Sequence, residues 1–151
     1  MGRKELVTLT NMCMIYDGDG NVLVQDKVNG NWTGIAFPGG HVEKGEGFVD
    51  SVVREVREET GLTVSDLRLC GIKQWISSDG SRYIVLCYKT NKFNGELRSS
   101  AEGEMRWVRM DELHGLKLAG GMEHTLRLFV EDEVTEHIGY KKDDEVVNLV
   151  K

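Results

Sequence analysis

The alternation of apolar and polar residues predicts strands joined by short turns over most of the chain. Residues 7–16 and 22–28 are two such segments, and an Asp-Gly-Asp-Gly turn lies between them, so we expect a hairpin. Residues 67–76 and 83–90 flank a second polar turn and are expected to form another pair of strands. The same pattern predicts shorter strands at residues 35–37 and 104–110, and an edge strand around residues 146–149.

Two helices are predicted between these strands. An apolar stripe spaced i, i+3, i+4, i+7 indicates an amphipathic helix over residues 47–59; its members are Val49, Val52, Val53 and Val56. A second amphipathic helix is expected over residues 122–134, with Leu126, Phe129 and Val130 turned inward. Because strands outnumber helices, we expect a mixed β-sheet flanked by helices, in the α/β (α+β) class, forming one domain over residues 1–151.

Three carboxylates crowd the C-terminal end of the first predicted helix. At 100° per residue, Glu55, Glu58 and Glu59 fall within about a 100° arc beside the apolar stripe. Glu55 and Glu59 are a like-charge i, i+4 pair, which costs roughly 0.2–0.5 kcal/mol. The cluster also lies just before Gly61, where we expect the helix to end and its dipole to disfavour anions. The arrangement is explained either by a solvated acidic face or by a bound cation that neutralises the cluster.

The segment GHVEKGEGFVDSVVREVREETGL, residues 40–62, decides between these explanations. It matches the Nudix box at every specified position: Gly40, Glu46, Arg54, Glu55, Glu58, Glu59 and Gly61, with apolar residues at 56 and 62. Seven fixed residues at about 7% usage each make a chance match on the order of one in 10⁸ per start position. The chain therefore resembles a Nudix hydrolase, and the lead-in with Trp32 and Phe37-Pro38-Gly39-Gly40 is also similar to that family. This resemblance implies a Nudix-type α/β/α sandwich with a mixed sheet.

The resemblance further implies a divalent-metal site at this helix. Glu55, Glu58 and Glu59 would supply the oxygen ligands that Mg²⁺ prefers, with Mn²⁺ as an alternative ion. In the family, the backbone carbonyl just before the box glycine also faces the metal, which maps here to Gly39. One carboxylate close to a metal-bound water can act as general base. We assign that role to Glu55 and expect Glu58 and Glu59 to be mainly ligands.

An arginine and a further acid belong to the expected site. The family pattern implies that Arg54 and Glu46 form a charge-assisted pair that holds the loop against the helix and orients Glu55. A direct catalytic role for Arg54 is the less favoured interpretation. Family members often add an acid from a loop beyond the box, and Glu102 is the candidate for this extra ligand or base. Glu104 is its alternative, and both also fit as solvated loop acids.

The nucleoside end of the site is less determined by the sequence. Trp32, Phe37 and Gly40 are the candidate substrate-binding residues, and the two aromatic faces can stack on any nucleobase. Trp75, Tyr83 and Trp107 are further aromatic candidates. All of them lie in or beside predicted strands, so a role in the core is the commoner outcome. Trp32 is the least core-like, since polar residues flank it.

Composition restricts the kinds of molecule that the protein is expected to bind. The formal net charge is −6, and no stripe rich in Lys and Arg is present. These features argue against a nucleic-acid polymer and favour a small phosphorylated molecule that a divalent metal brings in. No segment has the apolar length of a signal-peptide core or a membrane span, so we expect a cytoplasmic protein with no membrane partner. The oligomeric state is left open, a homodimer included.

The subgroup markers narrow the expected substrate. The only proline is Pro38, so the downstream prolines that mark the ADP-ribose and NADH groups of the family are absent. What remains resembles the MutT-like nucleoside triphosphate pyrophosphohydrolases, which release a nucleoside monophosphate and pyrophosphate and are usually associated with 8-oxo-dGTP. A dinucleoside polyphosphate or nucleotide-sugar hydrolase is the alternative within the family. A non-catalytic binding module is disfavoured, because all the box acids are present.

Overall fold

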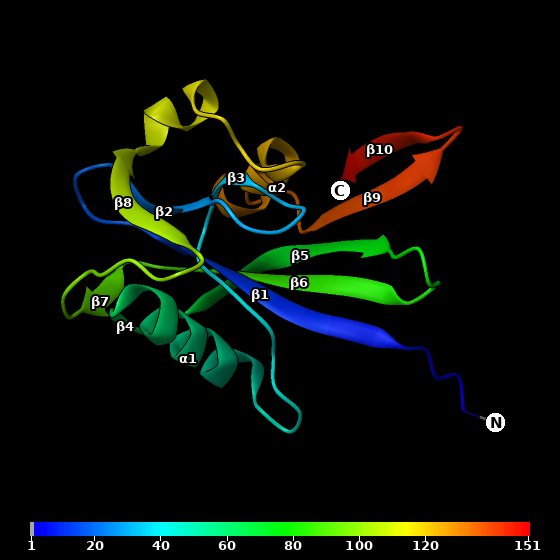
Figure 1. Ribbon diagram of the computed structural model, residues 1–151, viewed down its shortest axis with the longest axis horizontal. Helices are drawn as coiled ribbons and strands as arrows, with labels where there is room; N and C mark the ends of the chain where they lie inside the picture. Colours follow the sequence, from blue (N-terminus) through cyan, green and yellow to red (C-terminus); the bar gives the residue numbers. More distant parts are fainter. Residues whose placement is uncertain (1) are drawn as a thin grey trace.

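The computed structural model describes residues 2–151 (Figure 1). Ten strands form within these residues: β1 (Val7–Ile15), β2 (Asn21–Lys27), β3 (Gly34–Ala36), β4 (Thr63–Ser65), β5 (Arg68–Ile76), β6 (Arg82–Thr90), β7 (Lys92–Asn94), β8 (Gly103–Arg109), β9 (Glu136–Lys142) and β10 (Glu145–Val150). The same residues form α1 (Phe48–Thr60), the 3₁₀-helix η1 (Met110–Gly115) and α2 (Met122–Val130). Within residues 2–151, no helix combines the length and apolar character needed to span a bilayer.

The largest sheet is mixed, with the strand order β1-β6-β5-β9-β10. β5 and β6 form the predicted antiparallel hairpin, whereas β1 pairs with β6 and β9 pairs with β5 in parallel. β3, β2 and β8 form a three-stranded antiparallel sheet, and β4 and β7 form a two-stranded one. A mixed sheet flanked by helices confirms the predicted fold class.

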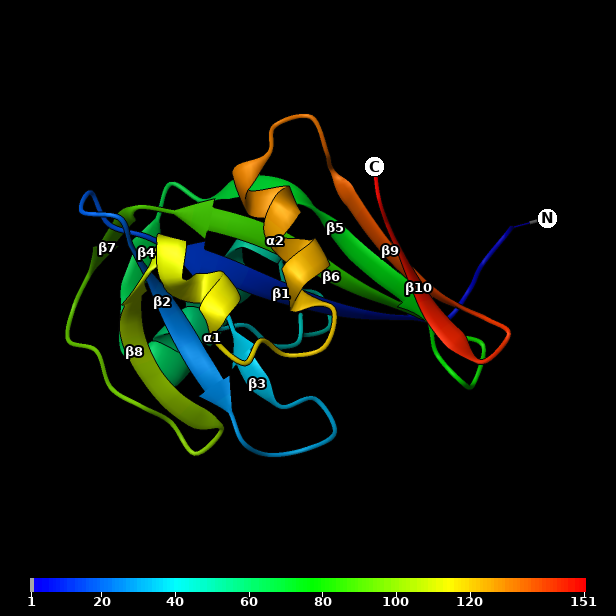
Figure 2. The ribbon, with the colours of Figure 1, turned by 90° about the horizontal axis from the view of Figure 1, so that it is seen from above.

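Both faces of β1 are buried, and this places the helices on opposite sides of the sheet. Because side chains alternate along a strand, Met12 enters one hydrophobic cluster and Cys13 enters the other. Val52 of α1 packs in the cluster with Cys13, while Phe129 of α2 packs in the cluster with Met12. Figures 1 and 2 show α1 and α2 separated by the strands.

The bounds of α1 are close to those predicted, but fewer of its apolar residues are buried than expected. It ends at Gly61, whose left-handed φ of 80° suits glycine and whose N–H donates to the Arg57 carbonyl. Val52 and Val56 are fully buried, whereas Val49 is 47% exposed. The prediction for Val49 was wrong: Val49 lies in the first turn of α1 and, unlike Val52 and Val56, belongs to neither hydrophobic cluster.

α2 is shorter than predicted. It ends at Val130, and the backbone of Glu131 is already extended. Val130 is 57% exposed, so its predicted inward orientation was wrong. The helix stops before the charged segment 131–133, which leaves Val130 in the last turn without a covering element.

The predicted hairpin of the first two strands was also wrong. β1 and β2 lie in different sheets and are linked only by an isolated bridge between Tyr16 and Val22. β1 is apolar on both faces, so it pairs with the buried strand β6 far along the chain rather than with its neighbour. At the other end of the chain, the expected edge strand is present as β10, and β9, which was not predicted, joins it to the sheet.

Candidate active site

An open cavity of about 1330 Å³ lies between the N-terminal end of the box segment and the C-terminal hairpin β9–β10. One end is acidic and is lined by Glu55, Glu59 and Glu102. The other end is lined by aromatic and polar residues of β5, β6, β9 and β10 and of the loop before β3: Trp32, Lys73, Trp75, Tyr83, His137 and Asn148. A single cavity therefore joins the two groups of residues that the sequence analysis treats as metal end and nucleoside end.

Gly39 and Gly40 line the acidic end of the cavity. The Asn11 N–H donates to the Gly40 carbonyl at 2.8 Å, and the Gly40 N–H donates to Asn11 Oδ1 at 3.1 Å. A Cβ at Gly39 would overlap the Asn11 backbone, so only glycine allows this approach. The Asn11 amide also donates to Ser51 Oγ at 2.9 Å, which ties β1 to α1. Asn11 was not selected from the sequence; its signal was a polar residue within an apolar strand.

Two of the three box carboxylates face the cavity. The carboxylate of Glu55 lies against Gly40, where a Cβ would overlap it. Glu59 is 5% exposed and accepts a hydrogen bond from the Gly39 N–H at 3.1 Å. Glu58 does not line the cavity; its side chain is 60% exposed and pairs with Arg54 at 3.2 Å.

Arg54 organises the carboxylates around the box. Its guanidinium donates two hydrogen bonds to Glu46, at 2.7 and 2.9 Å, and a third to the His41 carbonyl at 2.9 Å. Its Nη1 donates to Glu55 Oε1 at 2.9 Å and to Glu58 Oε2 at 3.2 Å. The hydrogen bonds from Arg54 lower the pKa of Glu46 to about 2. The expected Arg54–Glu46 pair is thus present, and Arg54 touches the proposed base without lining the cavity.

Glu59 and Glu102 lie side by side in the acidic end. Burial, together with a hydrogen bond to Glu102, raises the pKa of Glu59 to about 8, against the opposing charge of Lys27. Glu102 lines the cavity, whereas Glu104, two residues further on, is exposed on β8 and does not. The structure therefore places Glu102, and not Glu104, with the box carboxylates.

A family model described as "NUDIX domain" matches residues 8–130. The chain belongs to the Nudix family. Residues 40–62 are its Nudix box, and they lie entirely within the match. The hairpin β9–β10 lies outside it.

Relatives and solved structures agree with this assignment. The chain is 31% identical to an uncharacterised Nudix hydrolase, YvcI, of Bacillus subtilis, over 87% of this chain and 84% of that protein. It is 30% identical to the NAD-capped RNA hydrolase NudC of Mycobacterium tuberculosis, but the match spans 72% of this chain and only 35% of NudC. The fold is similar to that of the mutator MutT protein of Bacillus halodurans, with a TM-score of 0.80 and 27% identity over 95% and 97% of the two chains.

Membership of the Nudix family fixes the class of reaction. The protein is a Nudix hydrolase, an enzyme that hydrolyses a nucleoside diphosphate linked to another group. Nudix hydrolases generally use divalent metals such as Mg²⁺.

The residues at the acidic end of the Nudix site are of the chemical type that binds divalent ions. Carboxylates are the ligands that Mg²⁺ prefers, and Gly39 lines the same end of the cavity. Burial of Glu59 beside Glu102 raises the pKa of Glu59, and a bound cation would stabilise the charged form of this carboxylate. In the side-chain positions of residues 2–151, no three His, Cys, Asp or Glu are gathered closely enough to hold an ion. Glu58 would join the set only by leaving Arg54.

The raised pKa of the buried Glu59 carboxyl leads to a prediction about stability. We expect Glu59→Gln to stabilise the metal-free enzyme by about 1 kcal/mol near pH 7, or roughly 2–4 °C in Tm. The folded wild type must take up a proton at Glu59, and the uncharged glutamine avoids this cost while it keeps an acceptor for the Gly39 N–H. Mg²⁺ should raise the Tm of the wild type and not that of the variant. Thermal unfolding in EDTA and in Mg²⁺ measures both effects, with Glu104→Gln as the exposed control. An equal rise with Mg²⁺ in wild type and variant would remove Glu59 from the metal site.

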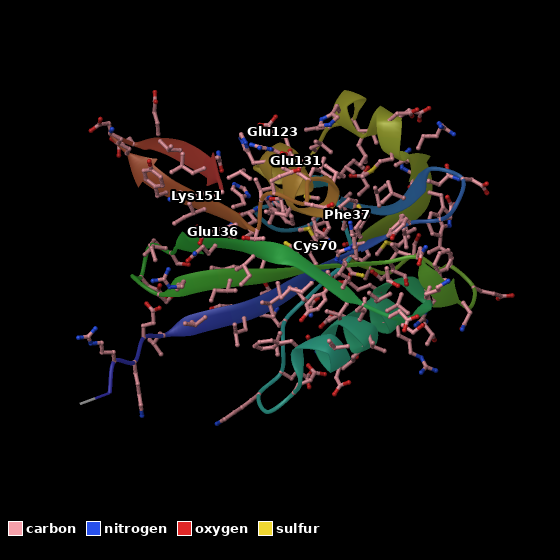
Figure 3. All side chains as sticks on the ribbon, turned by 180° about the vertical axis from the view of Figure 1, so that it is seen from behind. Phe37, Cys70, Glu123, Glu131, Glu136 and Lys151 are labelled. Atoms are coloured by element: carbon pink, nitrogen blue, oxygen red, sulfur yellow. The ribbon has the colours of Figure 1, made fainter. Side chains whose placement is uncertain are left out.

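The aromatic candidates separate into two groups. Trp32 lines the cavity and is held by a hydrogen bond from Nε1 to the Gly120 carbonyl at 2.9 Å. Trp75 and Tyr83 also line it and stack on each other, with ring centroids 4.3 Å apart. Phe37 borders the cavity but is buried edge-to-face against Phe129, at the centre of the molecule (Figure 3). Trp107 packs away from the cavity and belongs to the core, as the commoner outcome predicted.

The sequence analysis missed the polar residues at the nucleoside end: Lys73, His137 and Asn148. Lys73 is the first of two adjacent polar residues, Lys73 and Gln74, that interrupt the apolar pattern of β5, and such a lysine ordinarily belongs to a solvated face. His137 and Asn148 lie on β9 and β10, in a segment whose charged sequence gave little sign of a sheet. Backbone hydrogen bonds between Glu136 and Lys151 hold the open end of this hairpin, where the two residues lie together (Figure 3).

Proposed function

We propose that this Nudix hydrolase converts a nucleoside triphosphate and water into a nucleoside monophosphate and pyrophosphate in a reaction that requires Mg²⁺. The observation that carries the proposal is the continuity of the cavity, with the box carboxylates at one end and stacked aromatic rings at the other. A nucleotide bound along the cavity would place its phosphates at the carboxylates and its base among the rings. The similarity in fold to a mutator MutT protein supports this substrate class and makes 8-oxo-dGTP one of the nucleotides to test.

Each residue of the acidic end has a role in this proposal. Glu55, Glu59 and Glu102 would hold the metal together with the Gly39 carbonyl, and Glu58 would join them on leaving Arg54. When bound, the ion would neutralise charge on the phosphate oxygens and make the attacking water more acidic. Glu55 accepts the proton of that water as general base, and Arg54 fixes the orientation of its carboxylate. Lys27 lines the cavity near Glu59 and balances charge on the departing pyrophosphate.

A second candidate substrate class follows from the size of the cavity. Its volume of about 1330 Å³ exceeds the 300–1,000 Å³ that is usual for sites of drug-sized ligands. A dinucleoside polyphosphate or a nucleotide sugar would fill more of this space than a single nucleoside triphosphate. Such a substrate would use the same carboxylates.

A panel assay of the purified protein with Mg²⁺ tests the proposal. The panel contains the nucleoside triphosphates, 8-oxo-dGTP, a diadenosine polyphosphate and a nucleotide sugar, and the products are identified by chromatography. We expect pyrophosphate and a nucleoside monophosphate from at least one triphosphate, and no turnover in EDTA. Turnover of the dinucleotide or the sugar alone would select the second class. An absence of turnover with every compound would favour a binding module without catalysis.

A further inference from the structure

Lys73 is a buried cation at the nucleoside end of the cavity. It lies on β5, is 8% exposed and lines the cavity. Its ammonium group lies 5.2 Å from the ring centroid of Trp32 and 5.5 Å from that of Trp75. Within residues 2–151 it forms no salt bridge, and burial lowers the pKa of Lys73. A buried ammonium without a carboxylate partner is costly unless a ligand supplies acceptors.

The neighbours of Lys73 converge on Gly121 at the start of α2. A Cβ at Gly121 would lie 3.5 Å from Lys73 Nζ, 3.7 Å from His137 Cε1 and 4.0 Å from Asn148 Oδ1. The imidazole of His137 is already engaged, because Nδ1 meets Thr125 Oγ1 at 2.9 Å and Nε2 meets Asn148 Oδ1 at 2.8 Å. Among Lys73, His137 and Asn148, the polar hydrogens left for a ligand are those of the Lys73 ammonium and the Asn148 amide nitrogen. The nucleoside end therefore offers donors.

The hydrogen-bond donors at the nucleoside end, placed between aromatic rings, match the acceptor edge of a 6-oxopurine base. A 6-oxopurine such as guanine or hypoxanthine presents two adjacent acceptors, O6 and N7, which a lysine ammonium can bind together. Adenine presents a donor, its 6-amino group, in place of O6, and this group would face the Lys73 ammonium. The Trp75–Tyr83 stack and Trp32 supply the flat apolar walls that a base needs.

We propose that Lys73 selects a 6-oxopurine base over adenine, by donating to O6 at the end of the cavity closed by β9–β10. This inference depends on the proposed function, because it requires a nucleotide whose base lies at this end and whose phosphates lie at the carboxylates. The residues that shape this end come partly from the hairpin, which lies outside the segment matched by the family model. The selection is thus a property of this chain's own C-terminal segment together with β5.

The test compares Lys73→Met with the wild type on GTP, ITP and ATP. ITP retains O6 and N7 but lacks the 2-amino group, so it isolates the edge that Lys73 contacts. We expect the wild type to prefer GTP and ITP over ATP, and the variant to lose about 10- to 100-fold in kcat/KM on GTP and ITP with little change on ATP. Lys73→Arg keeps a charged donor and should retain most of the preference. Lys73→Leu, which also lacks a donor, replaces the methionine variant if that protein fails to fold.

Binding in EDTA gives a readout that does not depend on catalysis. Titrations of wild type and Lys73→Met with GMP, IMP and AMP should show weaker binding of GMP and IMP alone. A uniform loss with all three monophosphates, matched by weaker competition from inorganic phosphate, would mean that Lys73 holds a phosphate and would overturn the proposal. An unchanged base preference in the variant would overturn it too. If the wild type hydrolyses no triphosphate, the proposed function itself fails, a result distinct from either of these.

Discussion

Replacing Glu55 by glutamine is expected to lower kcat by about 10²- to 10⁴-fold, the usual contribution of a general base. Glutamine matches the size of glutamate and keeps an oxygen that can accept the hydrogen bond from Arg54 Nη1. It cannot accept a proton from water at neutral pH. The fold should remain intact, because Glu55 packs on Gly40 rather than within either hydrophobic cluster. Steady-state kinetics of pyrophosphate release measures the effect.

Two comparisons make the Glu55 result specific. Glu104→Gln is the same chemical change at an exposed acid of β8 that does not line the cavity, and it should leave kcat within about two-fold of wild type, since such surface substitutions rarely matter. A titration with Mg²⁺ separates the base from a ligand. If excess Mg²⁺ restores the turnover of Glu55→Gln, Glu55 acts by holding the metal, and the base must be another acid such as Glu102. If Glu55→Gln turns over as fast as the wild type without excess Mg²⁺, Glu55 is neither the general base nor a necessary metal ligand.

Replacing Gly40 by alanine is expected to reduce turnover by about 10²-fold, although Gly40 supplies no side chain to the chemistry. An alanine Cβ would overlap the carboxylate of Glu55 and force it away from its present position. A displacement of about 1 Å at a reacting group can cost on the order of 10²-fold in rate. The obstacle is the end of a side chain and not the backbone, so the loss of thermal stability should be small.

The matched control for Gly40 is Gly18→Ala. A Cβ at Gly18 would meet no heavy atom within 4 Å, and Gly18 lies in a turn that does not line the cavity, so this variant should keep wild-type activity. The double variant Gly40→Ala with Glu55→Gln gives a sharper check. If Gly40 acts by positioning Glu55, the double variant should be no slower than Glu55→Gln alone. Additive losses would show that Gly40 acts through another group.

The acidic end of the site could be predicted because its information is local. Glu55 and Glu59 lie one turn apart on one helix, so their common direction follows from the helical repeat alone. The Arg54–Glu46 pair follows from the same box. The orientation of Glu58 could not be predicted in this way, since its contact with Arg54 depends on how the guanidinium is shared among several carboxylates.

The nucleoside end could not be predicted from the sequence, because it is formed by contacts between distant parts of the chain. No local pattern of residues indicates such contacts. Lys73 and His137 become neighbours only because β9 pairs in parallel with β5. The alternation of β5 places Lys73 on the face that meets Trp32 and the start of α2, and both of these are far from Lys73 in the sequence. The same reason explains the failed hairpin of β1 and β2, where a long-range partner, β6, replaced the nearest one.

The position of β9–β10 has a consequence for how the substrate preference of this enzyme can be altered. The groups assigned to bond cleavage lie on α1, on its entry loop, at the end of β2 and in the loop before β8. Part of the wall around the base comes instead from the hairpin β9–β10, which joins the sheet by pairing with β5. Substitutions in the hairpin can therefore alter which nucleotide is accepted while the hydrolytic residues stay in place. A library confined to residues 136–150 is accordingly the natural starting point for redirecting this scaffold to a new base.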